Sequence, residues 1–425
     1  MGKGYITRRG GVGSAPAPAE DWVRPADWLA MPTVTSSEQK FVGLHAVWPN
    51  DANFVSLRCQ GDYTIDWGDG TVENFASNVQ ANHTYTYSAI SSSTESVRGY
   101  RQVIVTVTPQ AGNNFTLLDL QTKHNQSGLV GNYASGWLDI VTSLPNCSAS
   151  GLFIASSATT VRHRLLERSR LLNIGSQNTF LRLYFECSSL QAVEFPNTSG
   201  ITNCQLMFSN CRSIKAIPIF DTSNVTNFGS FALGCAALEA GPLLNTDSAV
   251  TMETMYSGCT SLKSVPLYNT ALCQNTSSMF INCFALTEVP PFNFSVLNNS
   301  VGMFFSCTSL RKIPLLNVSL VSNANQMFRL CTSLEQLPAM NFNSVSSAVN
   351  FNTIFGDVPS LAKMSATGFN YSFSVANAKL SAAALDEIYT NLPTVVGQTI
   401  TVTGNWGTAS HTPSIATGKG WTVTV

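Results

Sequence analysis

The stretch MFFSCTSLRKIPLLN, residues 303–317, contains the pattern that decides the fold. Its cysteine, Cys307, is one of a row that recurs every 24 residues from Cys187 to Cys331. A Leu or Ile stands three residues after each Cys, a Pro follows seven residues after it in all copies but the first, and an Asn or Asp follows ten residues after it. A fixed period between 20 and 50 residues indicates a solenoid. We therefore expect stacked coils, regular over residues 183–340.

One coil is expected to contain a short strand and a short helical turn. Residues 310–316 are apolar and carry a Pro that suits a strand end or edge. In residues 323–331, Met327, Phe328 and Cys331 recur at three- to four-residue spacing, which favours a helical turn. The Met–Phe pairs fill the interior, and each Asn ten residues after a Cys bonds the backbone of its turn. Stacking buries the apolar sides, and seven coils at roughly 4.8 Å give an array about 34 Å long.

The cysteine row has two interpretations, a metal or disulfide ladder and a row of small buried side chains. Cysteines in one ladder point the same way, which suits packing better than disulfide bonding. The sequence has no CxxC motif and no repeated His beside the row. We expect packing, with no metal and no cofactor.

The repeat pattern MFxxCxSLxxxPxxN resembles the BspA-type leucine-rich repeats. These repeats occur in bacterial surface proteins and in tail or surface proteins of phages. The resemblance covers about 160 residues. It implies a leucine-rich-repeat binding scaffold used in adhesion, without catalytic residues.

Composition narrows the class of protein. Charged residues make up 11% of the 425 residues and the net charge is −1, so no nucleic acid or anionic membrane is expected as partner. There is no apolar run long enough for a transmembrane helix. Residues 1–13 lack the apolar region of a secretory signal, which favours a virion protein assembled in the host cytoplasm over a bacterial cell-surface protein.

Residues 1–38 are predicted to form an extended N-terminal arm. A glycine-rich segment and an Ala-Pro repeat precede two tryptophans, Trp22 and Trp28. One interpretation is an anchor into a larger assembly, formed by Arg8, Arg9 and the two tryptophans. The other is a strap across the next domain of the same chain.

Residues 39–110 are predicted to form a small β domain with strands over residues 41–47, 54–58, 63–67 and 102–108. The runs YTIDWGDGT, residues 63–71, HTY, residues 83–85, and VIVTV, residues 103–107, are similar to the PKD-type β-sandwich. The resemblance implies an immunoglobulin-like spacer. Asp66 and Asp69 are expected to build a turn and not a calcium site, because they lack the spaced oxygen ligands of a dedicated loop.

The flanks of the regular array are predicted to complete the solenoid, giving repeat architecture over residues 111–375. The arginines of residues 162–170 form the most basic cluster of the chain, either a solvated face or a site for an anion. Residues 376–425 are predicted to be a C-terminal cap. Ser381 begins a helix there, and two strands follow, at residues 399–403 and 421–425.

The sequence contains no HExxH, GxSxG or P-loop motif. The acidic residues of the repeats, among them Glu239, Glu288 and Glu335, are interpreted as lying at different repeat positions. A glycosidase needs two facing carboxylates, so no catalytic residue is assigned and no enzyme is expected.

The fold class predicted is β-rich with short helices, a solenoid of 24-residue coils preceded by an immunoglobulin-like sandwich and an arm. The predicted function is a phage virion structural protein, a tail-fibre-like or surface-decorating adhesin that binds a glycan or protein of the host surface and forms a homo-oligomer on the particle. The alternatives are a purely structural decoration protein, a bacterial adhesin and a tailspike-like depolymerase. The predicted receptor-binding residues are exposed positions on the strand side: Lys215, Lys263, Tyr268, Arg311, Lys312, Glu335 and Gln336.

Overall fold

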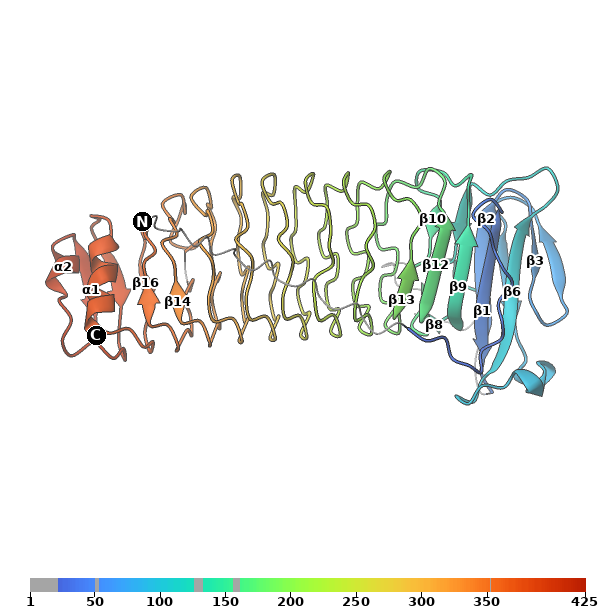
Figure 1. Ribbon diagram of the computed structural model, residues 1–425, viewed down its shortest axis with the longest axis horizontal. Coiled ribbons are helices and arrows are strands. Elements are labelled where there is room, and N and C mark those ends of the chain that lie inside the picture. Colours follow the sequence, from blue (N-terminus) through green and yellow to red (C-terminus); the bar gives the residue numbers. More distant parts are fainter. Residues whose placement is uncertain (1–21, 50–52, 126–132, 156–160, 352) are drawn as a thin grey trace, which may run out of the picture.

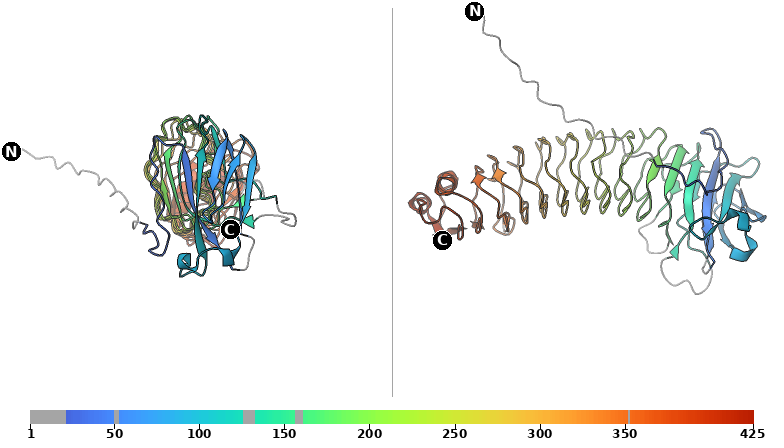
Figure 2. Two further views of the ribbon diagram at one scale, coloured as in Figure 1. Left: turned by 90° about the vertical axis from the view of Figure 1, so that its right-hand side faces the viewer. Right: turned by 60° about the horizontal axis from the view of Figure 1, so that its bottom comes forward.

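The computed structural model describes residues 22–49, 53–125, 133–155, 161–351 and 353–425. It is a rod of stacked coils with a β-sandwich at the N-terminal end and a cap with two short helices at the C-terminal end (Figure 1). Viewed end-on, the coils lie one behind another (Figure 2). The predicted fold class, a β-rich solenoid preceded by β-sheets, is confirmed.

The sandwich contains two sheets that share one hydrophobic core. Alternating side chains of β6, among them Val103, Val105 and Val107, point into this core. The strand order of the large sheet is β13-β12-β9-β1-β6-β3-β4, and that of the small sheet is β10-β7-β2-β5. The strands are β1 (Lys40–Val47), β2 (Phe54–Gln60), β3 (Tyr63–Asp66), β4 (Val72–Phe75), β5 (Gln80–Thr84), β6 (Arg101–Pro109), β7 (Leu117–Asp119), β9 (Trp137–Ser143), β10 (Leu152–Phe153), β12 (Arg168–Asn173) and β13 (Ala192–Glu194).

The large sheet joins the sandwich to the solenoid without a break. Strand β9 pairs with β1 in antiparallel fashion on one side and with β12 in parallel fashion on the other. Strand β12 then pairs with β13, which belongs to the first regular coil. Two 3-10 helices, η1 (Tyr87–Ala89) and η2 (Ser92–Thr94), lie in the loop before β6, and β8 (Tyr133–Ala134) pairs with β11 (Val161–Arg162).

The local structure of the regular coils differs from the prediction. Residues 310–316 contain a single bridge at Lys312 instead of a strand, and the stretch from 323 to 331 is a chain of turns instead of a helix. In these consecutive turns, backbone amides alternately donate to the next coil and to their own coil. Phe304 N donates to Met327 O of the next coil at 3.0 Å, and Phe305 N donates to Gly302 O of the same coil at 3.0 Å. In the equivalent stretch of the preceding coil, residues 300–307, every amide has an acceptor without a helix.

This alternation requires left-handed backbone at two positions in each coil. The residue five before and the residue one before each Cys both have φ between 53° and 74°. Left-handed backbone is costly for residues other than Gly, Asn and Asp. Four of the seven residues directly before the cysteines are of these types, Asn210, Gly234, Gly258 and Asn282, and the other three are Glu186, Ser306 and Leu330.

The cap agrees with the prediction. Helix α1 (Ala382–Asn391) begins after Ser381, whose hydroxyl accepts from Ala384 N at 3.2 Å. The closing coils extend the ladder through two small parallel sheets, and a second short helix was not predicted. These elements are β14 (Gln336–Leu337), β15 (Lys363–Met364), β16 (Phe373–Ser374), β17 (Gln398–Thr401), α2 (Ser414–Thr417) and β18 (Trp421–Thr424).

Candidate functional site

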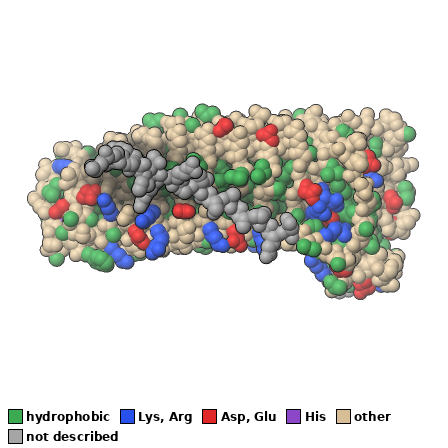
Figure 3. All heavy atoms as spheres, viewed as in Figure 1, with side chains coloured by type: hydrophobic (Ala, Val, Ile, Leu, Met, Phe, Trp, Pro, Cys, Tyr) green, Lys and Arg blue, Asp and Glu red, His purple; other side chains and the backbone are tan. Residues whose placement is uncertain are grey.

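The strand side of the solenoid is defined here as the surface formed by residues four to ten after each Cys. In the coil of Cys307, Ile313 and Leu316 on this segment are buried, whereas Arg311, Leu315 and Asn317 are exposed. Because coils repeat in register, each exposed position becomes a row along the rod. Figure 3 shows this pattern on one face of the molecule, with a line of charged side chains next to a line of hydrophobic ones.

A charged row runs along the strand side at the fourth residue after each Cys. Its signs alternate through Lys215, Glu239 and Lys263, and again through Arg311 and Glu335. Lys263 Nζ lies 2.7 Å from Glu239 Oε2, and Arg311 Nε lies 3.1 Å from Glu335 Oε1. The hydrogen bond from Lys263 and its charge lower the pKa of Glu239. The expectation that all the acids occupy different repeat positions was wrong, because Glu239 and Glu335 share this row.

An apolar row runs beside the charged row, eight residues after each Cys. Its members Ile219, Leu243, Leu267 and Leu315 are 72%, 49%, 64% and 61% exposed. Contiguous exposed apolar residues mark interaction surfaces more often than isolated ones do. The sequence carried a signal for this row, because these aliphatic residues directly follow the Pro row, but that signal was missed.

The structure places most of the predicted receptor-binding residues on the strand side. Lys215, Lys263, Arg311, Lys312 and Gln336 are exposed and Glu335 is half-buried. The prediction is wrong for Tyr268, which is buried.

The side chain of Tyr268 is 1% exposed. Its ring stacks on Tyr256, and its hydroxyl donates to Pro242 O at 2.9 Å. Tyr268 stands nine residues after a Cys, in a row that points inward, so a partner cannot reach it.

Uncharged polar side chains tie neighbouring coils together behind this surface. Asn317 Oδ1 accepts from Ser319 N at 3.2 Å, which confirms the turn role of the Asn row. The residue that follows is a buried Thr in four coils, and Thr270 Oγ1 donates to Asn293 O of the next coil at 2.9 Å. Equivalent bonds are made by Thr198, Thr222 and Thr246.

The cysteines are buried and free, as the packing interpretation predicted. The six cysteines of the row from Cys211 to Cys331 also serve as donors: Cys307 Sγ lies 3.1 Å from Phe280 O in the preceding coil, and the others make the equivalent contact. Burial raises the pKa of Cys331 to about 12, which keeps the thiol protonated. Among the described residues, no group of three or more His, Cys, Asp or Glu is placed to hold a metal.

The N-terminal segment from residue 22 onward is a strap on the large sheet. Trp28 is buried against Leu44 and Tyr100, and its Nε1 donates to the Tyr100 hydroxyl at 2.9 Å. Trp22 is half-buried; its ring is tilted against that of Trp28, and the Arg168 guanidinium lies 5.2 Å over it. Trp28 is therefore not an exposed docking element. The other two predicted anchoring residues, Arg8 and Arg9, lie outside the described residues.

The motif shared with the PKD-type sandwich has a structural role in this chain. Asp66 and Asp69 accept from the backbone of Gly68 and Thr71, each at 2.9 Å. Asp69 also lies 2.8 Å from His83 Nε2, and the His83 ring stacks on Trp67. These contacts close the turn, as the sequence predicted.

Two arginines of the basic cluster at residues 162–170 are paired within the protein. Arg168 contacts Glu194, and Arg170 lies 3.4 Å from the buried Asp139. Arg24 of the strap binds the same carboxylate at 3.2 Å. The cluster therefore connects the strap with the first coils, and its paired arginines offer little free charge to an anion.

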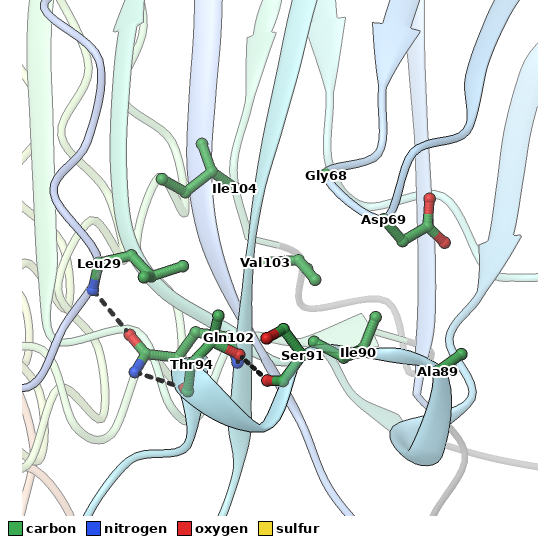
Figure 4. A pocket seen from close by; sticks show the side chains of 10 residues that line it. All are labelled: Leu29, Gly68, Asp69, Ala89, Ile90, Ser91, Thr94, Gln102, Val103 and Ile104. Atoms are coloured by element: carbon green, nitrogen blue, oxygen red, sulfur yellow. Dashed lines mark hydrogen bonds between the residues drawn. The ribbon is translucent and has the colours of Figure 1, made fainter.

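A pocket of about 420 Å³ lies between the strap and η2 (Figure 4). Gln102 on its wall is already bonded, accepting from Leu29 N at 3.0 Å and donating to Thr94 O at 3.1 Å. Asp69 is engaged by Thr71 and His83. The polar groups of this wall are therefore committed to the fold, and the strand side remains the candidate functional surface.

These features define a β-solenoid repeat protein with a long exposed ladder surface. Residues 178–289, 202–312 and 274–386 match the family model described as "Mycoplasma protein of unknown function, DUF285", so the coils over these residues are similar to DUF285 repeats. No curated protein matches the chain, and no solved structure matches it. No helix within the described residues is long and apolar enough to span a membrane.

Proposed function

We propose that the protein is a surface adhesin without enzymatic activity, a tail-fibre-like or decorating component of a phage virion that binds a host surface receptor through its strand side. Residues 1–21 connect it to neighbouring virion proteins, and copies assemble into a homo-oligomer. The same binding role fits a protein on a bacterial cell surface. The family match carries no function with it, so the support comes from the surface itself.

The apolar row of the strand side is the observation that carries this proposal. Its members at Ile219, Leu243, Leu267 and Leu315 are uncovered. A folded chain that needed only stability would place polar residues there, as it does at the neighbouring Asn row. The aromatic core below holds the row rigid: the ring of Phe304 stacks on Phe280 at 5.7 Å and on Phe328 at 5.9 Å between centroids. Rigid presentation reduces the entropy cost of binding.

The adjacent charged row favours selective binding of one partner over non-specific hydrophobic association. Alternating charges held at fixed spacing suppress partners with the wrong pattern. Lys263 and Glu239 pair with each other in the free protein, and a partner with a complementary sequence of charges exchanges such surface pairs at small cost.

The test is binding of the labelled full chain to a panel of intact bacterial cells. The variant Leu243→Ser, Leu267→Ser, Leu315→Ser is expected to bind at least tenfold more weakly, because the desolvated aliphatic area is lost. The matched control is Leu272→Ser, Val296→Ser, Leu320→Ser, which changes exposed apolar residues of another row. Equal loss in both variants contradicts a strand-side site. Binding only to purified virion proteins, and to no cell, favours the purely structural role.

A further inference from the structure

Trp406 in the C-terminal cap is an exposed indole. Its side chain is 74% accessible, whereas the other tryptophans are buried or half-buried. A tryptophan left in water forgoes the burial of one of the largest apolar side chains. Exposed tryptophans are also the residues that most often dominate binding sites. The exposure of Trp406 therefore indicates a ligand-binding role.

The backbone on both sides of Trp406 is fixed, so the indole is held outward. Asn405 is buried; its Oδ1 accepts from Leu380 N at 3.1 Å and its Nδ2 donates to Val375 O at 2.8 Å. Gly407 N donates to Leu380 O at 2.9 Å, and a Cβ at Gly407 would stand 2.1 Å from Ala382 N. A ring presented from such a segment loses little conformational freedom when it binds.

The charged row of the strand side leads to this indole. Backbone bonds join successive coils from Glu335 to Ala362, from Leu361 to Lys379, and from Leu380 to Gly407. Lys379 Nζ lies 5.9 Å from the centre of the Trp406 ring. The neighbouring row continues from Lys312 through Gln336 to Lys363 by parallel pairing.

The lysines at this end differ from the other charges of the row. Lys263 and Arg311 are paired with acids. Lys312, Lys363 and Lys379 have no carboxylate within salt-bridge distance among the residues that the structure describes. Lys379 therefore places beside the indole a positive charge that has no acidic partner in the described part of the chain, and Lys363 and Lys312 place two more on earlier coils of the same rod.

We propose that Trp406 with Lys379, Lys363 and Lys312 binds an acidic polysaccharide. The partly positive C–H groups on one face of a pyranose ring lie against the negative face of the indole, and the carboxylate of a uronic acid contacts a lysine ammonium. This inference rests on the proposed function and extends it, because it names the receptor as an anionic glycan. A neutral glycan uses the indole but leaves the lysines without a partner.

The first experiment measures binding of the full chain to polygalacturonate and to the same polymer after methyl esterification, which removes the charge and keeps the rings. The unmodified polymer is expected to bind at least tenfold more tightly. Trp406→Ala is expected to weaken this binding tenfold or more, and Trp406→Phe to retain most of it. Lys379→Gln with Lys363→Gln is expected to abolish the difference between the polymers. Arg212→Gln, which removes an exposed positive charge outside the strand side, is the control without effect.

Absence of binding to polygalacturonate, or binding that Trp406→Ala leaves unchanged, overturns this inference. The second experiment repeats the cell-binding measurement with Trp406→Ala. If wild type binds cells and Trp406→Ala binds them equally well, the glycan site is wrong and the adhesin proposal stands. If wild type binds polygalacturonate through Trp406 but binds no cell, the site stands and the adhesin proposal fails.

Discussion

Uncharged hydroxyl, amide and thiol groups, and not ion pairs, supply most of the side-chain bonds between neighbouring coils. Thr270 donates to the coil that follows it, and Cys307 donates to the coil that precedes it. Phe280 O accepts from the Cys307 thiol in addition to Cys283 N, and Asn293 O accepts from the Thr270 hydroxyl, so these carbonyls have donors in a stack that excludes water. This is the physical reason why a chain with 11% charged residues builds a long ordered stack.

His45 and His163 make the stability of the protein depend on pH. Both are buried where the sandwich meets the first coils. Burial lowers the pKa of His163 to about 4 and, with the nearby His163 charge, that of His45 to about 3. Because the folded pKa values lie below the unfolded value of about 6.5, the unfolded state binds more protons. Stability is therefore full above pH 6.5 and falls as the pH drops toward 4.

The expected loss between pH 7.5 and pH 5 is about 2 kcal/mol for each of these histidines. Urea unfolding at the two pH values measures it. In His163→Asn, which keeps a polar partner for the Ser135 hydroxyl now 2.5 Å from His163 Nδ1, the loss is expected to shrink by about this amount. The same pH dependence in wild type and variant contradicts this account.

For single residues, the sequence predicted which side chains are buried better than which are exposed. The period of the cysteines was sufficient to place them in the core, because every coil repeats the same environment. Tyr268 was misplaced because its row varies between Tyr, Phe, Leu and Met in the later coils, and variability was not a sign of exposure there. The core accommodates the hydroxyl by giving it Pro242 O as an acceptor. The Thr row was overlooked because it gives way to Phe294 and Val318 in later coils.

The secondary structure elements divide into those fixed by local pattern and those fixed by stacking. Strands β1, β2, β3 and β6 were predicted because their apolar alternation has the period of a strand. The turns of the coils were predicted as helix because Met, Phe and Cys recur at helical spacing. The residue before each Cys indicated a turn instead of a helix, because Asn and Gly recur there and both tolerate left-handed backbone.

Leu330 tests the left-handed turns. It occupies the position before Cys331 with φ of 61°, where other coils use Asn210, Gly234 or Asn282. Leu330→Asn is expected to stabilise the protein by about 1 kcal/mol, because Asn tolerates this backbone and Leu is strained in it. The measurement is the urea midpoint at constant m-value.

Leu320→Asn is the control: it makes the same substitution at an exposed position without a positive φ, whereas Leu330 is half-buried. It is expected to change stability by less than about 0.5 kcal/mol. A destabilised Leu330→Asn would show that the packing of the leucine side chain outweighs the backbone strain.

The whole molecule is one continuous ladder. The sheet of the sandwich passes through β9 and β12 into the coils, and Asp139 on β9 holds both Arg24 of the strap and Arg170 of the next strand. The sequence indicated a sandwich and a solenoid but not this junction, because parallel pairing between distant, irregular segments leaves no periodic trace. The position of Trp406 at the end of the charged row was equally hidden, since the terminal coils depart from the 24-residue period.

The cap decides whether the rod remains a single molecule. Trp421 packs edge-on against Phe373, and Val375 N donates to Thr401 O at 2.9 Å. A chain that stops at residue 375 loses these contacts and ends in open backbone groups above an aromatic core. Terminal repeats of solenoids need a polar outer face, and an uncovered strand edge pairs with other chains. We expect this truncated chain to associate head to tail as its concentration rises and to melt several degrees below the full chain.

Sedimentation velocity over a concentration series, compared with the full chain, measures this association. The variant Val396→Ser, which changes an 89% exposed residue of the cap without removing it, should remain monodisperse to the same extent as the full chain. A truncated chain that stays as monodisperse as the full chain at every concentration would mean that the coil of Phe373 closes the core without help. The cap would then serve mainly to present Trp406, and its loss would affect glycan binding alone.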